Sequence, residues 1–284
     1  MRTNSWCRWD FVKTYLINLD RSPDRLEWFM GATKDLGLDI VRVSAFDGRT
    51  LSMEESAEII SKRRGHGAMI GRADIGCFLS HRETWRQIAA GNDPWAFVAE
   101  DDVHLATSAR RFLESYDWIP EGADIIKAET WLTPVRVTLW NNPRVSNHTL
   151  RVLHSTHFGA AGYFISSRCA ANILQWTENA WGIADCILFD DRVEFFRRFK
   201  IYQIDPAICI QDFNVKSTRR VGFESVRIEA NIKDGVQKRI IPDERKRSKL
   251  SHLFRIVARP FEHFWRHKAF LLKGQWVKTI SFEN

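Results

Sequence analysis

The fold class that this sequence predicts is α/β, with an open, mostly parallel sheet flanked by helices. Two patterns lead to it: a strand, a helix and a second strand follow one another between residues 14 and 43, and a long helical pattern precedes a buried strand at residues 95–99. The composition agrees, because 44% hydrophobic and 27% charged residues are ordinary values for a folded globular protein. A chain of 284 residues holds one large domain, or one domain and an appendage.

The first strand, helix and second strand can be placed from local signals. Residues 14–19 form an apolar, β-branched run of strand length. The helix begins at Ser22 and Pro23, because serine suits the N-cap and proline the first helical position. Apolar residues recur at helical spacing over residues 24–36, and residues 40–43 form the second strand. In open sheets of this kind, nucleotides bind at the carboxyl ends of the strands.

The later elements follow the same two periodicities. We expect helices at residues 51–64, 73–90 and 168–177, and strands at residues 95–99, 123–127, 158–166 and 201–210. A glycine-rich connection precedes the long helix, and Pro206 bends the last strand or marks a sheet edge. We find no internal repeat in the sequence.

Hydropathy and cysteine spacing limit where the protein can reside. Charged residues interrupt the first 19 residues, so no run of signal-peptide length is present there. No stretch of 18 or more apolar residues occurs, which leaves only peripheral contact with a membrane. The five cysteines are scattered and include no C-x-x-C pair, so we expect buried thiols. These features predict a cytoplasmic protein, with the inner face of the membrane as its peripheral contact.

The net charge of +7 is distributed unevenly along the chain. Residues 216–284 carry 17 Lys and Arg against 7 Asp and Glu, whereas residues 1–215 carry 25 against 28. We therefore divide the chain into a main domain, residues 1–218, and a basic, aromatic C-terminal helical appendage, residues 219–284. The nearly neutral main domain gives no reason to expect nucleic acid as a partner. The appendage suits an anionic membrane surface, and a solvated helix packed on the main domain fits it equally well.

An acidic triplet follows the buried strand at residues 95–99. Because side chains alternate along a strand, Glu100 and Asp102 should face one side and Asp101 the other. Two carboxylates can hold a hard divalent cation, which neutralises the charge that a leaving diphosphate develops. An acidic turn after a strand is also a common solvated feature, so the triplet alone does not establish a function.

The sequence resembles glycosyltransferase family 25, which includes bacterial lipooligosaccharide galactosyltransferases and related collagen-modifying enzymes. The resemblance covers roughly residues 14–218 and is carried by four ordered motifs: YLINLDR at 15–21 with Arg25, AFDGR at 45–49, IGCFLSH at 75–81 with Trp85, and VAEDD at 98–102. Weaker support comes from GAAGYFIS at 159–166, IADCILF at 183–189, and Gln211 with Ser217.

What the resemblance implies is a GT-A-like fold and a metal-dependent hexosyltransferase that inverts the anomeric centre. The expected donor is a UDP-hexose, with UDP-galactose favoured, and the expected cation is Mn²⁺ or Mg²⁺. The expected acceptor is a lipopolysaccharide, a lipooligosaccharide or another cell-surface glycan.

The resemblance also implies roles for individual residues. Glu100 and Asp102 would bind the metal, and Asp185 would act as the general base that an inverting reaction requires. The residues that would contact the nucleotide sugar are Asn18, Arg21, Arg25, Asp47, Ser80, His81 and Gln211. Arginine suits this task because its paired N–H donors match phosphate oxygens.

Each of these motifs also has a plain structural explanation. The arginines can form ion pairs at a helix start, and a single helical histidine is more often a packed core residue than a catalyst. Asp185 can simply favour the start of a helix, and Asp190 and Asp191 compete with it as bases.

A third protein ligand for the cation is expected, and the sequence does not choose it. His154, His157 and Asp212 could supply it, and His104 continues the alternation of the acidic pair. Ser217, together with Gln211, is a candidate contact for the diphosphate or the acceptor.

Two functions of other kinds are also compatible with the sequence. One is a non-catalytic glycan-binding or adhesion protein that keeps the fold, and the other is a different cation-dependent enzyme acting on nucleotide sugars or phosphates. Release of UDP in the presence of manganese separates the first from a transferase, and a screen of donor nucleotides separates the second.

Overall fold

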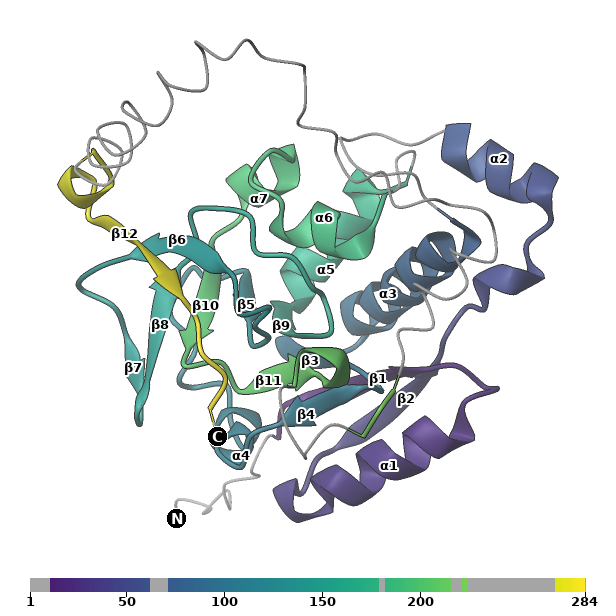
Figure 1. The fold of residues 1–284 in the computed structure, drawn as a ribbon, viewed down its shortest axis with the longest axis horizontal. Helices are drawn as coiled ribbons and strands as arrows, with labels where there is room; N and C mark the ends of the chain where they lie inside the picture. Colours follow the sequence, from purple (N-terminus) through teal and green to yellow (C-terminus); the bar gives the residue numbers. More distant parts are fainter. Residues whose placement is uncertain (1–10, 62–70, 179–181, 216–220, 224–268, 284) are drawn as a thin grey trace, which may run out of the picture.

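The computed structural model describes residues 11–61, 71–178, 182–215, 221–223 and 269–283. Its centre is an eight-stranded sheet in the order β2-β1-β3-β9-β5-β10-β8-β7, with helices packed on both faces (Figure 1). The predicted α/β class, with an open sheet flanked by helices, is confirmed.

The central strands run mostly in one direction. β1 (Lys13–Asn18) pairs in parallel with β2 (Ile40–Ser44) and with β3 (Trp95–Glu100). β9 (Gly162–Ser166) lies antiparallel between β3 and β5 (Ile125–Lys127). The carboxyl ends of β1, β2, β3 and β5 therefore meet at one edge of the sheet, together with the start of β9.

The remaining strands complete the sheet and add two short ribbons. β10 (Ile201–Asp205), β8 (His148–Val152) and β7 (Arg144–Val145) finish the large sheet, with β10 parallel to β5. The antiparallel ribbons join β4 (Val103–Leu105) to β11 (Cys209–Gln211), and β6 (Pro134–Thr138) to β12 (Gln275–Thr279).

Helices cover the two faces of the large sheet (Figure 1). The helices are α1 (Pro23–Thr33), α2 (Met53–Ser61), α3 (Arg72–Ala90), α4 (Ala109–Leu113), α5 (Ser167–Trp176), α6 (Ala184–Phe189) and α7 (Glu194–Arg198). Short 3₁₀ turns lie at Lys34–Leu36, Gly48–Thr50 and Asp212–Asn214. No helix in the described ranges has both the length and the apolarity that a membrane span needs.

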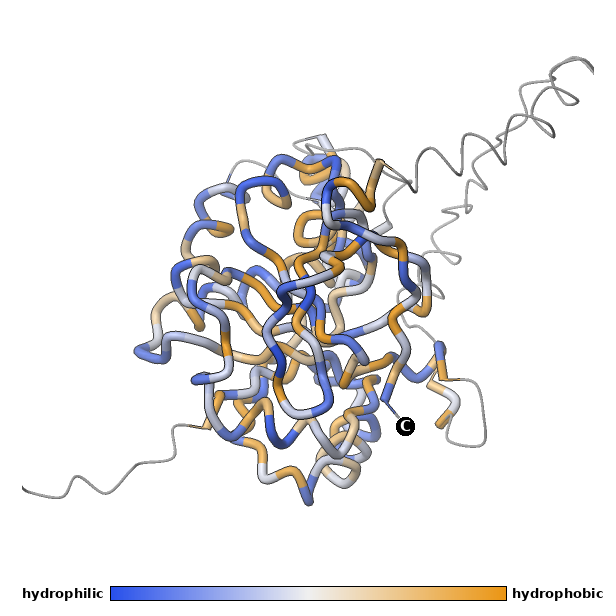
Figure 2. The backbone as a smooth tube through the Cα atoms, turned by 90° about the vertical axis from the view of Figure 1, so that its left-hand side faces the viewer, coloured by the Kyte–Doolittle hydropathy of each residue, from blue (hydrophilic) through white to orange (hydrophobic). Residues whose placement is uncertain are grey.

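Alternating side chains of the central strands build a separate hydrophobic core on each face. Tyr15 and Ile17 of β1 belong to the cluster beneath α3 and α5, whereas Leu16 belongs to the cluster beneath α1 and α4. β3 divides in the same way, with Val98 in the first cluster and Phe97 in the second. Figure 2 shows hydrophobic and hydrophilic stretches interspersed along the backbone. Burial on both faces makes the strand ends at this edge rigid supports for polar side chains.

Two predicted strands have different bounds in the structure. The strand expected over residues 201–210 is divided at Pro206, so β10 joins the large sheet and β11 pairs with β4. Proline lacks the N–H that would continue the ladder. The strand expected from residue 158 begins only at Gly162, because Gly159 has a φ of 91° and leaves the extended region.

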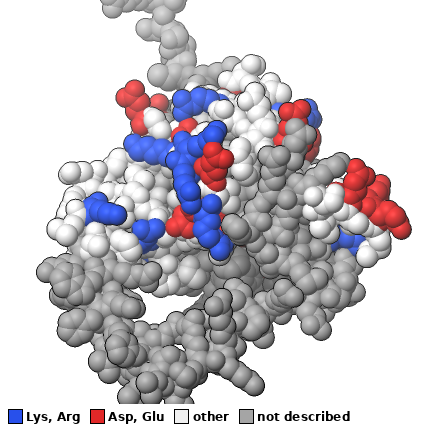
Figure 3. Space-filling view, turned by 90° about the horizontal axis from the view of Figure 1, so that it is seen from above, with Lys and Arg blue, Asp and Glu red and all other residues white. Residues whose placement is uncertain are grey.

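The final described residues pack against the main domain. β12 pairs with β6, Ile280 is fully buried, and the Thr130 hydroxyl donates to the Ile280 carbonyl at 2.7 Å. The predicted membrane-contacting residues of the appendage lie mainly within 224–268, outside the described residues, and that contact stays a prediction. On the described part of the face seen in Figure 3, Lys and Arg lie next to Asp and Glu, without an extended patch of one sign.

Candidate active site

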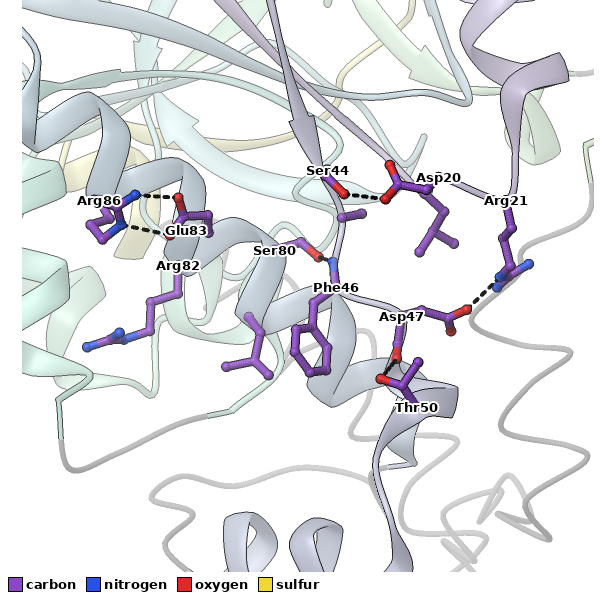
Figure 4. Close-up of a pocket in the computed structure, with 13 residues that line it drawn as sticks. Asp20, Arg21, Ser44, Phe46, Asp47, Thr50, Ser80, Arg82, Glu83 and Arg86 are labelled. Carbon is purple, nitrogen blue, oxygen red and sulfur yellow. Dashed lines mark hydrogen bonds and ion pairs between the residues drawn. The ribbon is translucent and has the colours of Figure 1, made fainter.

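A cavity of about 620 Å³ opens at the carboxyl ends of β1 and β2. Its walls come from three segments: the residues after β1, the residues after β2, and one side of α3 (Figure 4). The lining residues are Leu19, Asp20, Arg21, Ser44, Ala45, Phe46, Asp47, Thr50, Leu79, Ser80, Arg82, Glu83 and Arg86. This is the position at which an open sheet binds ligands.

The loop at residues 45–49 is held directly against α3. The Phe46 amide donates to the Ser80 hydroxyl at 2.8 Å, and that hydroxyl donates to the Gly76 carbonyl at 2.7 Å. A Cβ atom at Gly76 would lie 2.6 Å from both the Phe46 carbonyl oxygen and the Gly48 nitrogen, and one at Gly48 would collide with the Arg72 carbonyl. Two glycines thus allow loop and helix to meet backbone against backbone, and this contact forms one wall of the cavity.

Ion pairs surround the mouth of the cavity. Asp47 accepts hydrogen bonds from Arg49 and from Arg21, with nitrogen–oxygen distances of 2.7 Å and 2.8 Å, and these contacts hold the pKa of Asp47 well below its usual range. Glu83 pairs with Arg86 at 2.6 Å, which lowers the pKa of Glu83 to about 2.

Arg82 differs from the other arginines of the cavity. It extends from α3 at the cavity wall, and it has no ion pair or hydrogen bond among the residues that the structure describes (Figure 4). A guanidinium without a protein partner is available to a ligand, and its fork of donors suits phosphate or carboxylate oxygens.

The acidic triplet lies beside this cavity, at the end of β3. Asp101 accepts hydrogen bonds from the Asn18 amide at 2.7 Å and from Arg25 at 3.3 Å, so it turns toward β1 and α1. Glu100 and Asp102 share the Gln211 side chain, whose Nε2 lies 3.4 Å from an oxygen of each.

The triplet gathers three carboxylates at one strand end, and Asp101 and Asp102 are buried there. Burial, followed by the charges of Glu100 and Asp101, raises the pKa of Asp102 to about 8. Burial also raises the pKa of Asp101, although Asn18 and Arg25 oppose this shift. A divalent cation would relieve the repulsion, and carboxylate and amide oxygens are the ligands that Mn²⁺ and Mg²⁺ prefer. Glu100 and Asp102 therefore fit the predicted cation. They lie close enough together for the Gln211 side-chain amide to contact both carboxylates, so a single cation could contact both as well.

A buried chain of hydrogen bonds fixes Glu100 from behind. His81 Nε2 lies 3.2 Å from Glu100 Oε1, and His81 Nδ1 lies 3.0 Å from the Tyr163 hydroxyl. The Trp85 indole donates to the same hydroxyl at 2.8 Å, and Trp85, His81 and Tyr163 are all fully buried. His81 thus supports the acidic triplet instead of lining the cavity, whereas its neighbour Ser80 lines the cavity.

The three candidates for a third metal ligand have other partners. His157 accepts a hydrogen bond from the Trp131 amide at 3.3 Å and contacts Gln203 at 2.8 Å, and burial lowers its pKa to about 3. His154 contacts the Thr138 hydroxyl at 3.1 Å. Neither contact involves the acidic triplet.

Asp212, the third candidate, fixes a short loop. Its carboxylate accepts hydrogen bonds from the amides of residues 221–223 at 2.7–2.9 Å and lies 2.7 Å from His104 Nε2. Phe223 of that loop packs against the Arg25 guanidinium, and its ring centroid lies 4.9 Å from Arg25 Cζ. Asp212 therefore positions this loop beside Arg25, and its carboxylate oxygens are already bonded to the loop and to His104.

Residues 159–161 connect the triplet to Asp185. The Glu100 amide donates to the Ala161 carbonyl at 3.0 Å, and the Gly159 amide donates to Asp185 Oδ2 at 3.1 Å. The other carboxylate oxygen of Asp185, Oδ1, is buried and has no hydrogen-bond partner in the described part of the chain. The competing carboxylates are engaged, since Asp190 pairs with Arg192 and Asp191 accepts from Thr156.

A buried ion pair holds the same segment from below. Lys127 and Glu129 are both fully buried, with their charged atoms 3.5 Å apart. Glu129 accepts from the Ala161 amide at 2.9 Å, and Lys127 donates to the Gly159 carbonyl. Burial raises the pKa of Glu129 to about 7, although the neighbouring ammonium opposes this.

The predicted nucleotide-sugar residues form two groups in the structure. Arg21, Asp47 and Ser80 line the cavity, whereas Asn18, Arg25, His81 and Gln211 contact the acidic triplet. Ser217 lies outside the described residues.

The Lys127–Glu129 pair was missed by sequence reasoning. Its signal is the one that identified the triplet, namely charged residues at the end of an apolar strand at the same edge of the sheet. Arg82 had no comparable signal, because its role depends on which neighbouring arginines already have partners.

Comparisons with known proteins identify the family of the chain. The model of "Glycosyltransferase family 25 (LPS biosynthesis protein)" matches residues 11–188. The lipooligosaccharide biosynthesis protein lex-1 of Haemophilus influenzae is 28% identical over 181 residues, 60% of each chain. The lacto-N-neotetraose biosynthesis glycosyltransferase LgtE of Neisseria meningitidis is 29% identical over 161 residues, 51% of this chain and 55% of that protein. The chain thus spans about three-fifths of the length of the curated relatives it matches.

Among solved structures, a glycosyltransferase involved in glycosylation of the major capsid of PBCV-1 aligns with 80% of this chain and 100% of its own. The TM-score is 0.36 and the identity 10%, a likeness that supports no inference about function.

Proposed function

Because the chain belongs to glycosyltransferase family 25, we propose that it transfers a hexose from a nucleotide sugar onto a lipopolysaccharide, a lipooligosaccharide or another cell-surface glycan. The observation that carries the proposal is the adjacency of a polar cavity and an acidic triplet with a raised Asp102 pKa at the carboxyl ends of β1, β2 and β3. The donor is UDP-galactose and the anomeric centre is inverted, as the family resemblance implies.

The cavity binds the nucleotide sugar. Its volume of about 620 Å³ is in the range of ordinary small-molecule sites. Arg82 and Arg21 bring positive charge to it, and Asp47 keeps Arg21 oriented. Guanidinium groups at a strand–helix junction suit a diphosphate, which needs several charge-assisted hydrogen bonds.

Glu100 and Asp102 would hold the divalent cation, Mn²⁺ or Mg²⁺. When bound, such a cation supplies stabilisation of the negative charge that develops on the leaving diphosphate. The chain prepares this position in two ways. His81 holds Glu100 from the buried side, and Arg25 limits the repulsion by pairing with Asp101.

Asp185 is the general base. Its Oδ2 is fixed by the Gly159 amide. Its Oδ1, which is buried and has no hydrogen-bond partner among the described residues, is the atom that would accept the proton of the acceptor hydroxyl. Removing this proton makes the hydroxyl oxygen a better nucleophile as it bonds to the anomeric carbon and the diphosphate departs. Residues 159–161 keep the base and Glu100 in a fixed relation, because they are bonded to both.

The proposal is tested by measuring UDP release from UDP-galactose with Mn²⁺, with and without a lipooligosaccharide acceptor. We expect acceptor-dependent release that a chelator abolishes. Binding of the glycan without release from any nucleotide sugar in a donor panel would instead establish a non-catalytic glycan-binding protein.

A further inference from the structure

A thiol and an imidazole lie beside the carboxylate that the proposed cation would use. Cys77 and His81 are four residues apart on α3, so both project toward the end of β3. Cys77 Sγ lies 4.0 Å and His81 Nε2 lies 3.2 Å from Glu100 Oε1, and the three ligand atoms all lie within 4.8 Å of one another.

We propose that Cys77, His81 and Glu100 form a binding site for Zn²⁺, and that zinc bound there inhibits the transferase. This inference rests on the proposed function only for its inhibitory consequence. Zinc would take Glu100 away from the cation that assists the diphosphate, so the two metals would compete for one carboxylate.

The distances are close to those of a zinc site. With Zn–S near 2.3 Å and Zn–N and Zn–O near 2.0 Å, the ligand atoms of a tetrahedral site with one sulfur lie about 3.3–3.6 Å apart. The separations present, which are at most 4.8 Å, therefore differ from these values by no more than about 1.5 Å, a change that side-chain rotations can supply. The fourth position would be filled by water.

The histidine already has the outer partner that a zinc ligand needs. His81 Nδ1 faces the Tyr163 hydroxyl at 3.0 Å, and that oxygen accepts a hydrogen bond from Trp85 while keeping a second lone pair. The hydroxyl can accept a hydrogen bond from the Nδ1–H group. In that tautomer Nε2 carries no proton and can coordinate the metal. The rings of His81 and Tyr163 also stack at 5.9 Å, so the imidazole plane is fixed before any metal binds.

Donor chemistry separates this site from the neighbouring one. Glu100 and Asp102 offer hard oxygen ligands, whereas Cys77 and His81 add sulfur and nitrogen, for which Zn²⁺ has a much higher affinity than Mn²⁺ or Mg²⁺. Cys77 is half-buried and the Glu100 side chain is 25% exposed, so an ion can reach the site from solvent. Cys77 has no part in the proposed transfer itself, and this makes it the residue with which to separate the two sites.

The experiment compares the full chain, Cys77→Ser and Cys186→Ser under reducing conditions. Cys186 is also half-buried and is not in a disulfide, and it serves as the matched control. Zn²⁺ affinity is measured without donor or acceptor by competition with a chromophoric chelator. We expect Cys77→Ser to weaken zinc binding at least tenfold, and Cys186→Ser to leave it unchanged. With Co²⁺ as a probe, a thiolate-to-metal absorption band should appear in the full chain and in Cys186→Ser, but not in Cys77→Ser.

Transfer assays then test inhibition. With Mn²⁺ present, added Zn²⁺ should inhibit the full chain, and Cys77→Ser should need at least tenfold more zinc for the same inhibition while keeping its zinc-free rate. Equal zinc affinity in the full chain and Cys77→Ser, with Cys77→Ala giving the same result, would overturn the zinc site and leave the transferase proposal standing. Cys77-dependent zinc binding in a protein without transfer activity would uphold the site and contradict the proposed function.

Discussion

The cavity and the acidic triplet are neighbours that balance charge in opposite ways. Around the cavity, carboxylates pair with arginines, and the pKa values of Asp47 and Glu83 are lowered. At the triplet, burial and mutual repulsion raise the pKa of Asp102 to about 8. In the first region the carboxylates are paired with arginines of the protein, and Arg82 remains for a ligand. The second gathers like charges at one strand end, so the two regions should respond differently to substitution.

The largest effect is expected from Asp102→Asn. Losing one cation ligand should reduce the rate of transfer about 10³-fold, because the charge on the leaving diphosphate is no longer stabilised. Because folding raises the pKa of Asp102 from 3.8 to about 8, this carboxyl destabilises the cation-free fold increasingly as the pH rises from about 4 to 8, and fully above pH 8. The neutral amide removes this cost, so it should keep or increase the melting temperature at neutral and alkaline pH. Steady-state UDP release and thermal melts measure both. Full activity of this variant would remove the triplet from the mechanism.

Asp185→Asn should have the next largest effect. Loss of a general base is expected to lower kcat by about 10²–10³-fold, with donor affinity unchanged, because Asp185 is bonded to residues 159–161 and not to the cavity wall. Single-turnover transfer together with calorimetric titration of the donor separates the two quantities. Transfer near the normal rate would move the base elsewhere.

Arg82→Met should affect the cavity alone. Removing an arginine that has no partner among the described residues should weaken donor binding about tenfold, with little change in Mn²⁺ affinity. Arg86→Met is the matched control, because Arg86 is already paired with Glu83, and its effect should be smaller. If both variants weaken donor binding equally, donor affinity does not depend on whether an arginine is already paired with a carboxylate.

Gly76→Ala should have the smallest effect on transfer, confined to the cavity wall. The added methyl group would lie 2.6 Å from backbone atoms of the 45–49 loop, so we expect a loss of about 1–3 kcal/mol of unfolding free energy and a few-fold weaker donor binding. Gly31→Ala in α1 is the control, since no atom lies within 4 Å of its Cβ position. That variant should be neutral or slightly more stable, as chemical denaturation would show.

The parts of the fold that depend on local pattern could be predicted from the sequence. β1, α1 and β2 lie where strand runs, a serine–proline start and helical spacing placed them. The triplet was identified because three acidic residues directly follow one apolar strand. In each case the determining residues are close together in the chain.

The parts that depend on tertiary contacts could not be predicted in the same way. His81 and Ser80 are adjacent, yet one is buried behind Glu100 and the other lines the cavity, because successive helical residues face about 100° apart. Asp212 was a candidate ligand until the structure placed the amides of residues 221–223 around it. A polar side chain is available to a ligand only where groups from distant parts of the chain do not already bond to it, and the local sequence does not show this.

The pairing of β12 with β6 has a consequence for biosynthesis. Val135 and Val137 of β6 are buried in the native protein, but the strand beside them is made about 140 residues later. As the chain leaves the ribosome, one edge of β6 is therefore unpaired until the final strand emerges, and exposed strand edges invite association with other chains. Translation of residues 275–279 thus closes the edge, and a nascent chain stalled before residue 275 should be a preferred client of chaperones.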